Sequence, residues 1–183
     1  SHFGDCDTGQ FFMRTKFTYP DGEFSSATFT EGFSGIAKQF SMEWDVHDTS
    51  HLPRVLIMVS KIDHCLNDLL YRYRTGALRM KIPAIVSNHD ELRKLAEWHD
   101  IPYHHVPVTP PTKAAAEEQL LQIVADTQAD IVVLARYMQV LSDDLCRQLA
   151  GKAINIHHSF LPGFKGARPY QQAHDRGVKL IGA

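Results

Sequence analysis

From residue 54 onward, short apolar runs alternate with stretches whose apolar residues recur at helical spacing. The first run, Arg54–Ser60 (RVLIMVS), is almost continuously apolar, which is typical of a strand buried on both faces of a parallel sheet. Further strands are predicted at 82–87, 103–108, 130–135, 153–156 and 178–181, and helices at about 63–74, 88–99, 113–127, 142–150 and 169–176. Asp63 and Ser142 are the predicted N-caps of two of these helices. This alternation predicts an α/β fold with a doubly wound parallel sheet.

Residues 1–50 follow a different pattern. A strand is predicted within 10–17, a helix at about 30–40 and a closing strand at 42–46. These elements are too few to bury a core alone, and their order predicts the second half of a small α+β sandwich. The segment His51-Leu52-Pro53 marks a boundary, so the predicted domains are residues 1–50 and residues 54–183.

Composition and charge exclude several classes of function. The chain is 44% apolar and 22% charged, as in an ordinary soluble globular protein, and its net charge of −2 with no basic run argues against nucleic acid as a partner. No apolar run is long enough to span a membrane. Three widely separated cysteines (Cys6, Cys65 and Cys146) fit reduced thiols in the cytoplasm. Ser1-His2-Phe3 is not a typical start and the chain stops at the end of a predicted strand, so we expect it to be a piece of a longer protein.

Ligands of doubly wound sheets bind at the carboxyl ends of the strands. This rule selects four loops, at 60–64, 88–90, 136–141 and 157–166. The segment Ser60–Cys65 contains no glycine, which excludes a Gly-x-Gly-x-x-Gly site for NAD or FAD, and the chain has no P-loop. A metal site is not predicted, because His157 and His158 are adjacent and point to opposite faces of a strand, with no Cys or carboxylate at ligand spacing nearby.

Asn155 and His157 lie two positions apart at the end of the predicted strand Ala153–Ile156, which we expect to be buried. An amide and an imidazole delivered together suit carbonyl chemistry, because one can stabilise an oxyanion while the other moves a proton. The alternative is an asparagine bonded to backbone and a surface histidine, and the residues alone leave both interpretations open. For the segment 136–141, the residues alone favour core packing over a pocket for a flat heteroaromatic ligand.

Two segments carry a resemblance to a known family. Asn155-Ile156-His157, Ser159-Phe160-Leu161-Pro162 and Lys165-Gly166 together resemble the N-x-H-x-S-x-L-P…KG signature of folate-dependent formyl-transfer enzymes. The segment Leu134-Ala135-Arg136-Tyr137-Met138 resembles the L-A-x-x-M segment that holds the folate ring in the same enzymes.

Further details resemble the hydrolytic branch of that family. His158 stands where the transferases usually carry proline, and Ser60–Leu70 resembles the S-K-x-x-H-C-L-x-D-L-L motif of this branch. The transferases that act on glycinamide ribonucleotide carry a Gly/Ser-rich phosphate-binding turn at that position. The branch also carries an N-terminal ACT domain, and Gly9–Arg14 resembles the latter part of one. The resemblance thus extends over the whole chain.

The resemblance implies a formyltransferase-like fold and hydrolysis of 10-formyltetrahydrofolate to tetrahydrofolate and formate, which supplies formate for purine biosynthesis and balances one-carbon pools. The implied catalytic residues are Asn155 and His157, and the third, an aspartate, is expected beyond Ala183. The implied substrate-binding residues are Arg136, Tyr137, Met138, Gln139, Val140 and Leu141, while Ser60, His64 and Cys65 could border a pocket for water or formate. No cofactor is implied, because the tetrahydrofolate derivative is the substrate.

Two other functions stay open. The first is a formyltransferase that moves the formyl group to an amine such as glycinamide ribonucleotide. The second is a catalytically inert protein that senses an amino acid. The ACT-like part implies an amino-acid effector and, because such domains pair between chains, a homo-oligomer.

Overall fold

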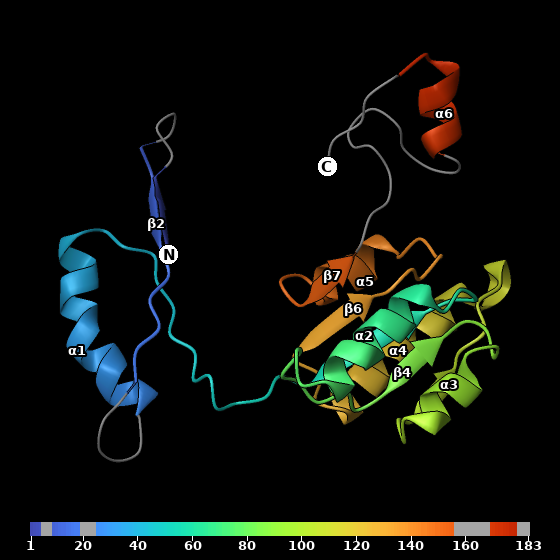
Figure 1. The fold of residues 1–183 in the computed structure, drawn as a ribbon, viewed down its shortest axis with the longest axis horizontal. Coiled ribbons are helices and arrows are strands. Elements are labelled where there is room, and N and C mark those ends of the chain that lie inside the picture. The colour runs from blue at the N-terminus through green and yellow to red at the C-terminus, as the bar shows by residue number, and fades with distance from the viewer. Residues whose placement is uncertain (5–8, 19–24, 156–168, 179–183) are drawn as a thin grey trace. The chain divides into compact units, whose positions relative to one another are not determined.

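The computed structural model divides the chain into two compact units, Ser1–His51 and Leu52–Ala183, which are described separately (Figure 1). The structure describes residues 1–4, 9–18, 25–155 and 169–178. The predicted strand at 178–181 and the predicted histidine-containing loop at 157–166 therefore lie almost wholly or wholly outside the described residues.

The first unit contains a short antiparallel pair and one helix. Strand β1 (His2–Gly4) pairs with β2 (Phe11–Met13), and helix α1 (Ser26–Gln39) follows. The predicted strand within 10–17 and the predicted helix are found, although the helix begins earlier, where the Ser25 hydroxyl accepts a hydrogen bond from the N–H of Thr28. Strand β1 was not predicted, because its three residues are too few to produce a pattern.

The closing strand predicted at 42–46 is wrong, because this segment has no regular structure. Its tryptophan instead packs against α1: the Trp44 ring lies 4.9 Å from that of Phe33 and 6.2 Å from that of Phe29, edge-on in both cases. Within the described residues no strand pairs with this segment. Its alternating pattern therefore belongs to a segment that packs on a helix, not to a strand of a sheet.

The second unit is built on a five-stranded parallel sheet with the order β5-β4-β3-β6-β7. Its strands are β3 (Val55–Val59), β4 (Ile85–Ser87), β5 (Tyr103–His105), β6 (Ile131–Leu134) and β7 (Ala153–Asn155). All four pairings are parallel. The α/β fold with a doubly wound parallel sheet is therefore confirmed.

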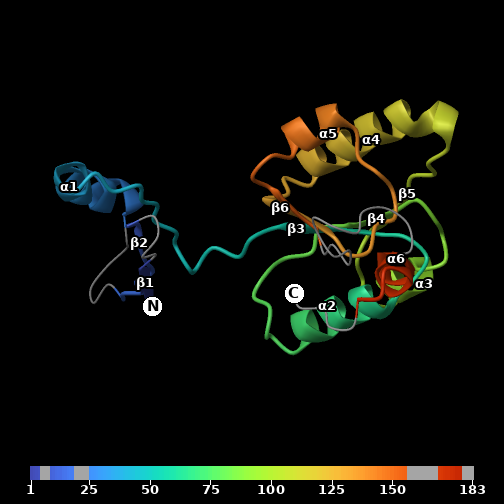
Figure 2. The ribbon, with the colours of Figure 1, turned by 90° about the horizontal axis from the view of Figure 1, so that it is seen from above.

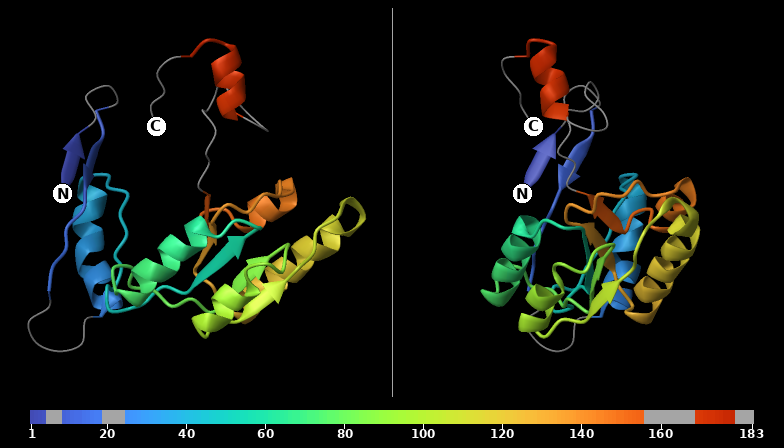
Figure 3. Two further views of the ribbon diagram at one scale, coloured as in Figure 1. Left: turned by 45° about the vertical axis from the view of Figure 1, so that its right-hand side comes forward. Right: turned by 90° about the vertical axis from the view of Figure 1, so that its right-hand side faces the viewer.

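Two pairs of helices cover opposite faces of this sheet (Figure 2). Helices α2 (His64–Arg74) and α3 (Arg93–Trp98) lie on one face, and α4 (Lys113–Asp126) and α5 (Asp143–Gln148) lie on the other. The same layers are visible in the two views of Figure 3. A 3₁₀ turn (η1, Pro110–Thr112) precedes α4, and helix α6 (Pro169–Asp175) comes last in the chain.

Strand β3 joins the two halves of the core. All five of its residues are buried, as the continuous apolar run predicts. Leu56 and Met58 belong to the cluster beneath α4 and α5, whereas Val55, Ile57 and Val59 belong to the cluster beneath α2 and α3. This alternation follows from the period of two in a strand, and it places β3 at the centre of both layers.

Two local predictions about strands and caps differ from the structure. Strand β7, predicted to be buried, is exposed at all three residues, because among the described residues it is an edge strand that only β6 pairs. Asp63 makes no capping hydrogen bond with its side chain, which instead accepts one from the Asn67 amide. Ser142 caps α5 as predicted, accepting a hydrogen bond from the N–H of Leu145 at 3.1 Å.

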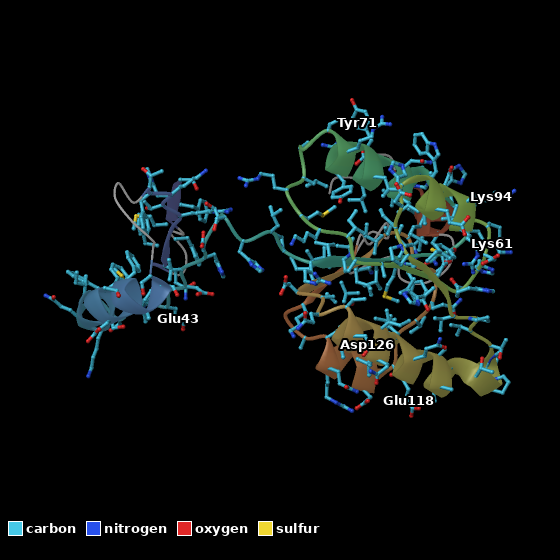
Figure 4. All side chains as sticks on the ribbon, turned by 90° about the horizontal axis from the view of Figure 1, so that it is seen from below. Glu43, Lys61, Tyr71, Lys94, Glu118 and Asp126 are labelled. Carbon is cyan, nitrogen blue, oxygen red and sulfur yellow. The ribbon has the colours of Figure 1, made fainter. Side chains whose placement is uncertain are left out.

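The two faces of α2 provide a test of the core. Leu70 is fully buried, whereas its neighbour Tyr71 is 59% exposed and points outward from the helix, as Glu118 and Asp126 do from α4 on the opposite surface (Figure 4). We predict that Leu70→Ala lowers the free energy of unfolding by about 2–5 kcal/mol, because it removes apolar contacts and leaves a cavity. The control Tyr71→Ala changes it by about 0.5 kcal/mol or less. Denaturant unfolding of both variants measures the difference, and equal losses would contradict the assigned helix face.

Candidate active site

A cavity of about 260 Å³ lies where β3, β4 and β6 end. It is lined by Ser60, Lys61, Ile62, Asn88, His89, Arg136, Met138 and Gln139. These residues come from three of the four strand-end loops that the sequence selects, and Lys61 is visible near the end of β3 in Figure 4. The strand order reverses between β3 and β6, which is where ligands bind in such sheets.

The Ser60 hydroxyl joins the three loops. It donates a hydrogen bond to Oδ1 of Asn88 at 2.6 Å and accepts one from the backbone N–H of Met138 at 3.0 Å. Its backbone carbonyl accepts a longer hydrogen bond from Ser87 Oγ at 3.4 Å. Ser60 is only 4% exposed, so these bonds satisfy a polar group that would otherwise be costly to bury.

The segment 136–141 leaves β6 through an unusual turn. Arg136 has φ +63°, a left-handed conformation that is uncommon for residues other than glycine. Beyond it, Tyr137 and Leu141 pack against the core beneath α4 and α5, whereas Met138 and Val140 are exposed. The core packing that the residues alone favour is thus confirmed for two side chains of this segment, and its role in binding a ligand stays a prediction.

Glu117 of α4 holds the far end of this segment. Its carboxylate accepts one hydrogen bond from the backbone N–H of Ser142 at 2.9 Å and a second from the Ser142 hydroxyl. Hydrogen bonds to an ionised acceptor are stronger than neutral ones. The segment is therefore attached at Met138 through Ser60 and at Ser142 through Glu117.

Asn155 is the last residue of β7, and its partner in the parallel register is Leu134 of β6. It is therefore one strand spacing, about 4.8 Å, from the strand that leads into Arg136. Its proposed companion His157 lies outside the described residues. Their role in catalysis stays a prediction.

The sequence suggests Ser60, His64 and Cys65 for a pocket that holds water or formate. His64 and Cys65 do not line the cavity. His64 is the exposed first residue of α2, and Cys65 is half-buried against the core beneath α2 and α3. Ser60 lines the cavity, but its hydroxyl is occupied by Asn88 and Met138. Sequence reasoning missed the bonding role of Asn88, because its partner is 28 residues away; its place in a selected strand-end loop was the one available signal.

Among the residues that the structure describes, no group of three His, Cys, Asp or Glu side chains could hold a metal ion. Across the same residues, no helix is both long and apolar enough to cross a membrane.

Comparison with known proteins assigns most of the chain to a family. Residues 53–183 match the family described as formyl transferase. A formyltetrahydrofolate deformylase from Corynebacterium sp. (strain P-1) is 47% identical over 181 residues, which cover 99% of this chain and 63% of that protein. The chain thus spans less than two thirds of the length of this relative.

Two solved structures also resemble this chain. The crystal structure of a formyltetrahydrofolate deformylase from Pseudomonas syringae pv. tomato matches with a TM-score of 0.88 and 50% identity, covering 99% of this chain and 61% of that one. A phosphoribosylglycinamide formyltransferase from Brucella melitensis matches with a TM-score of 0.63 and 28% identity, covering 72% of this chain and 70% of that one.

Tyr137 provides a pH-dependent test of the loop's packing. Burial, with a further contribution from the charge of Glu117, raises the pKa of Tyr137 from 10.0 to about 12. Between these values the unfolded chain loses a proton that the folded chain keeps, so the free energy of unfolding falls as the pH rises. We predict that Tyr137→Phe, which lacks this proton, loses stability less steeply above pH 10. Denaturant unfolding below and above pH 10 tests this, and parallel pH curves for the two proteins would contradict the packing.

Proposed function

Because this chain belongs to the formyl transferase family, we propose that it hydrolyses 10-formyltetrahydrofolate to tetrahydrofolate and formate. The observation that carries the proposal is its likeness to formyltetrahydrofolate deformylases, at 47% sequence identity to one relative and a TM-score of 0.88 to a crystal structure. The likeness covers 99% of this chain in both cases.

The proposed reaction breaks the bond between the formyl carbon and the folate nitrogen. Water attacks the formyl carbon and forms a tetrahedral oxyanion, which the side-chain N–H of Asn155 stabilises. His157 moves a proton to the folate nitrogen as the carbon–nitrogen bond breaks. The formyl carbon leaves as formate, which carries one oxygen from water, and the nitrogen leaves protonated as tetrahydrofolate. An aspartate beyond Ala183 would orient His157 and the water.

The segment 136–141 is the proposed binding site for the folate ring. Supporting observations are its exposed Met138 and Val140 side chains, its attachment at both ends and its position next to β7. A segment fixed in this way loses little conformational entropy when it binds a flat ring, which favours affinity.

Water is the proposed acceptor of the formyl group, rather than an amine carried on a phosphorylated sugar. A phosphate usually binds to backbone N–H groups of a glycine-rich turn at a helix N-terminus. The segment Ser60–Cys65, which precedes α2, contains no glycine. The transferase of known structure from Brucella melitensis is also less similar to this chain than the deformylases are.

We also propose that residues 1–50 are part of an ACT-like regulatory domain. Support comes from the antiparallel pair and helix of this unit and from the start of the family match at residue 53. An amino-acid effector and a homo-oligomer accompany this proposal, and the cytoplasmic location stays a prediction from the sequence.

Formate release tests the proposed reaction. We predict that the full-length protein releases formate from 10-formyltetrahydrofolate with no amine acceptor present. Replacement of Asn155 by Ala lowers kcat about 10²–10³-fold, because it removes one oxyanion donor. The chain has three asparagines, and Asn67→Ala on the exposed surface of α2 is the matched control, with unchanged turnover.

Two outcomes would contradict the proposal. Formate release that requires an amine would indicate a transferase. Unchanged turnover in Asn155→Ala would remove this residue from the reaction.

Effector binding tests the regulatory domain. We predict that one of the natural amino acids raises the thermal unfolding temperature of the full-length protein, since a ligand that binds only the folded state stabilises it. A variant that lacks residues 1–50 serves as the control for the location of that effect. If no amino acid shifts the unfolding temperature, the proposed sensing role is wrong.

A further inference from the structure

The cavity at the ends of β3, β4 and β6 has a lining suited to an anion. Its side chains include a lysine, an arginine, a histidine and two amides, and no carboxylate among the described residues lines it. In the described part of the chain neither Lys61 nor Arg136 forms an ion pair, so both charges are available to a ligand.

Asp63, Asp90 and Glu91 are the acidic residues within two positions of a lining residue in the sequence. The Asp63 carboxylate accepts a hydrogen bond from the Asn67 side chain. Asp90 pairs with Arg93 at 2.7 Å, and this bond holds the pKa of Asp90 below its usual value. Glu91 lies 4.0 Å from the ring of His89 and does not line the cavity. Among the described residues, the Lys and Arg side chains that line the cavity are Lys61 and Arg136, and no described carboxylate lines it.

Asn88 adds a directed hydrogen-bond donor to these charges. It is 7% exposed and lines the cavity. Its Oδ1 accepts the Ser60 proton, and the described residues provide no partner for its side-chain nitrogen. Since no buried side-chain polar atom of those residues lacks a partner, this nitrogen must be reached by solvent, and it opens to the cavity.

The orientation of this amide follows from the hydrogen-bond chain. The Ser60 oxygen accepts the N–H of Met138, so the single Ser60 proton is free to point at Asn88. A hydroxyl that donates to Asn88 must face the amide oxygen rather than the nitrogen. Ser60 is thus a positioning residue that holds the Asn88 oxygen and leaves the side-chain nitrogen of Asn88 for the cavity.

We propose that this cavity is a carboxylate-binding subsite, in which the Asn88 amide donates to the bound anion while Arg136 and Lys61 balance its charge. A guanidinium and an amide together supply the planar donors that a carboxylate accepts. The occupant is formate, and the choice of formate rests on the proposed hydrolysis. A cavity of about 260 Å³ holds formate together with several water molecules, each of which occupies roughly 30 Å³.

This subsite is separate from the group that would stabilise the oxyanion. Strands β4 and β7 are three strand spacings apart in the sheet, or about 14 Å. Asn88 therefore does not act on the same atom as Asn155. Its role is to hold the small product, and water, beside the folate-binding segment, whose Met138 and Gln139 line the same cavity.

Direct binding of ¹³C-formate, without any folate, tests the subsite independently of catalysis. We predict that the full-length protein broadens the formate NMR line in a saturable way. Asn88→Ala and Asn88→Asp weaken this binding about tenfold to a hundredfold, the effect of losing one hydrogen bond to a charged ligand. The aspartate keeps an oxygen for Ser60 and so preserves the local structure, and Asn67→Ala is the matched control with unchanged affinity.

The relay through Ser60 has its own test in a double-mutant cycle. Ser60→Ala weakens formate binding in the parent, but has no further effect on formate affinity in the Asn88→Ala background, because Ser60 acts through Asn88. A purely structural role for Ser60 would weaken binding equally in both backgrounds, and that result would overturn the relay.

Competition with other anions tests whether the subsite prefers a carboxylate to a phosphate. Comparison of formate binding with formate release then distinguishes the subsite from the proposed hydrolysis. Displacement of formate by acetate, but not by phosphate at matched ionic strength, supports a carboxylate site. Displacement by phosphate alone, or unchanged affinity in Asn88→Asp, overturns it. If formate binds as predicted but the protein releases none from 10-formyltetrahydrofolate, the proposed reaction fails and the subsite stands. If hydrolysis occurs without saturable formate binding, the subsite fails alone.

Discussion

The parallel register around β3 is the constraint on which the rest of this protein depends. A strand buried on both faces has no solvent-facing side, so both helix layers must pack against it. Because all its neighbours run parallel, every strand delivers its following loop to the same edge. Ser60, Asn88 and Arg136 are far apart in the sequence, and this register alone makes them neighbours around one cavity.

The edge of the sheet where the strands end also contains a buried hydroxyl, that of Ser60, which needs hydrogen-bond partners. Ser60 follows directly after β3 and is almost inaccessible to solvent. Burial of a hydroxyl without hydrogen bonds is unfavourable. The Ser60 hydroxyl accepts a hydrogen bond from the Met138 N–H and donates one to the side-chain oxygen of Asn88. This solution also fixes the start of the segment 136–141, whose first residue adopts a left-handed conformation that needs support from its surroundings.

The sequence predicts the sheet well because its signal is local. Continuous apolar runs and helical stripes identify β3, α2 and α4 without knowledge of any partner. The signal fails where the outcome depends on what lies next to a segment: Trp44 packs on a helix instead of joining a sheet, and β7 is exposed although two of its three residues are apolar. The hydrogen bonds of Asn88 to Ser60 and of Glu117 to Ser142 join residues 28 and 25 positions apart in the sequence. A periodic pattern of apolar residues cannot predict hydrogen bonds over such separations.

The Ser60 hydrogen bonds also bear on the choice between hydrolysis and transfer. A serine at a strand end could, from its sequence position alone, bind the phosphate of an acceptor. Here its proton points at Asn88 and its oxygen accepts from Met138, so its hydroxyl belongs to the interior of the protein. Among the described residues, the other polar side chains that line the cavity are two amides, a histidine and two cations, and the segment Ser60–Cys65 has no glycine-rich turn to bind phosphate through its backbone. Such a lining suits a small planar anion with water around it, which is what a formyl group becomes when water is its acceptor.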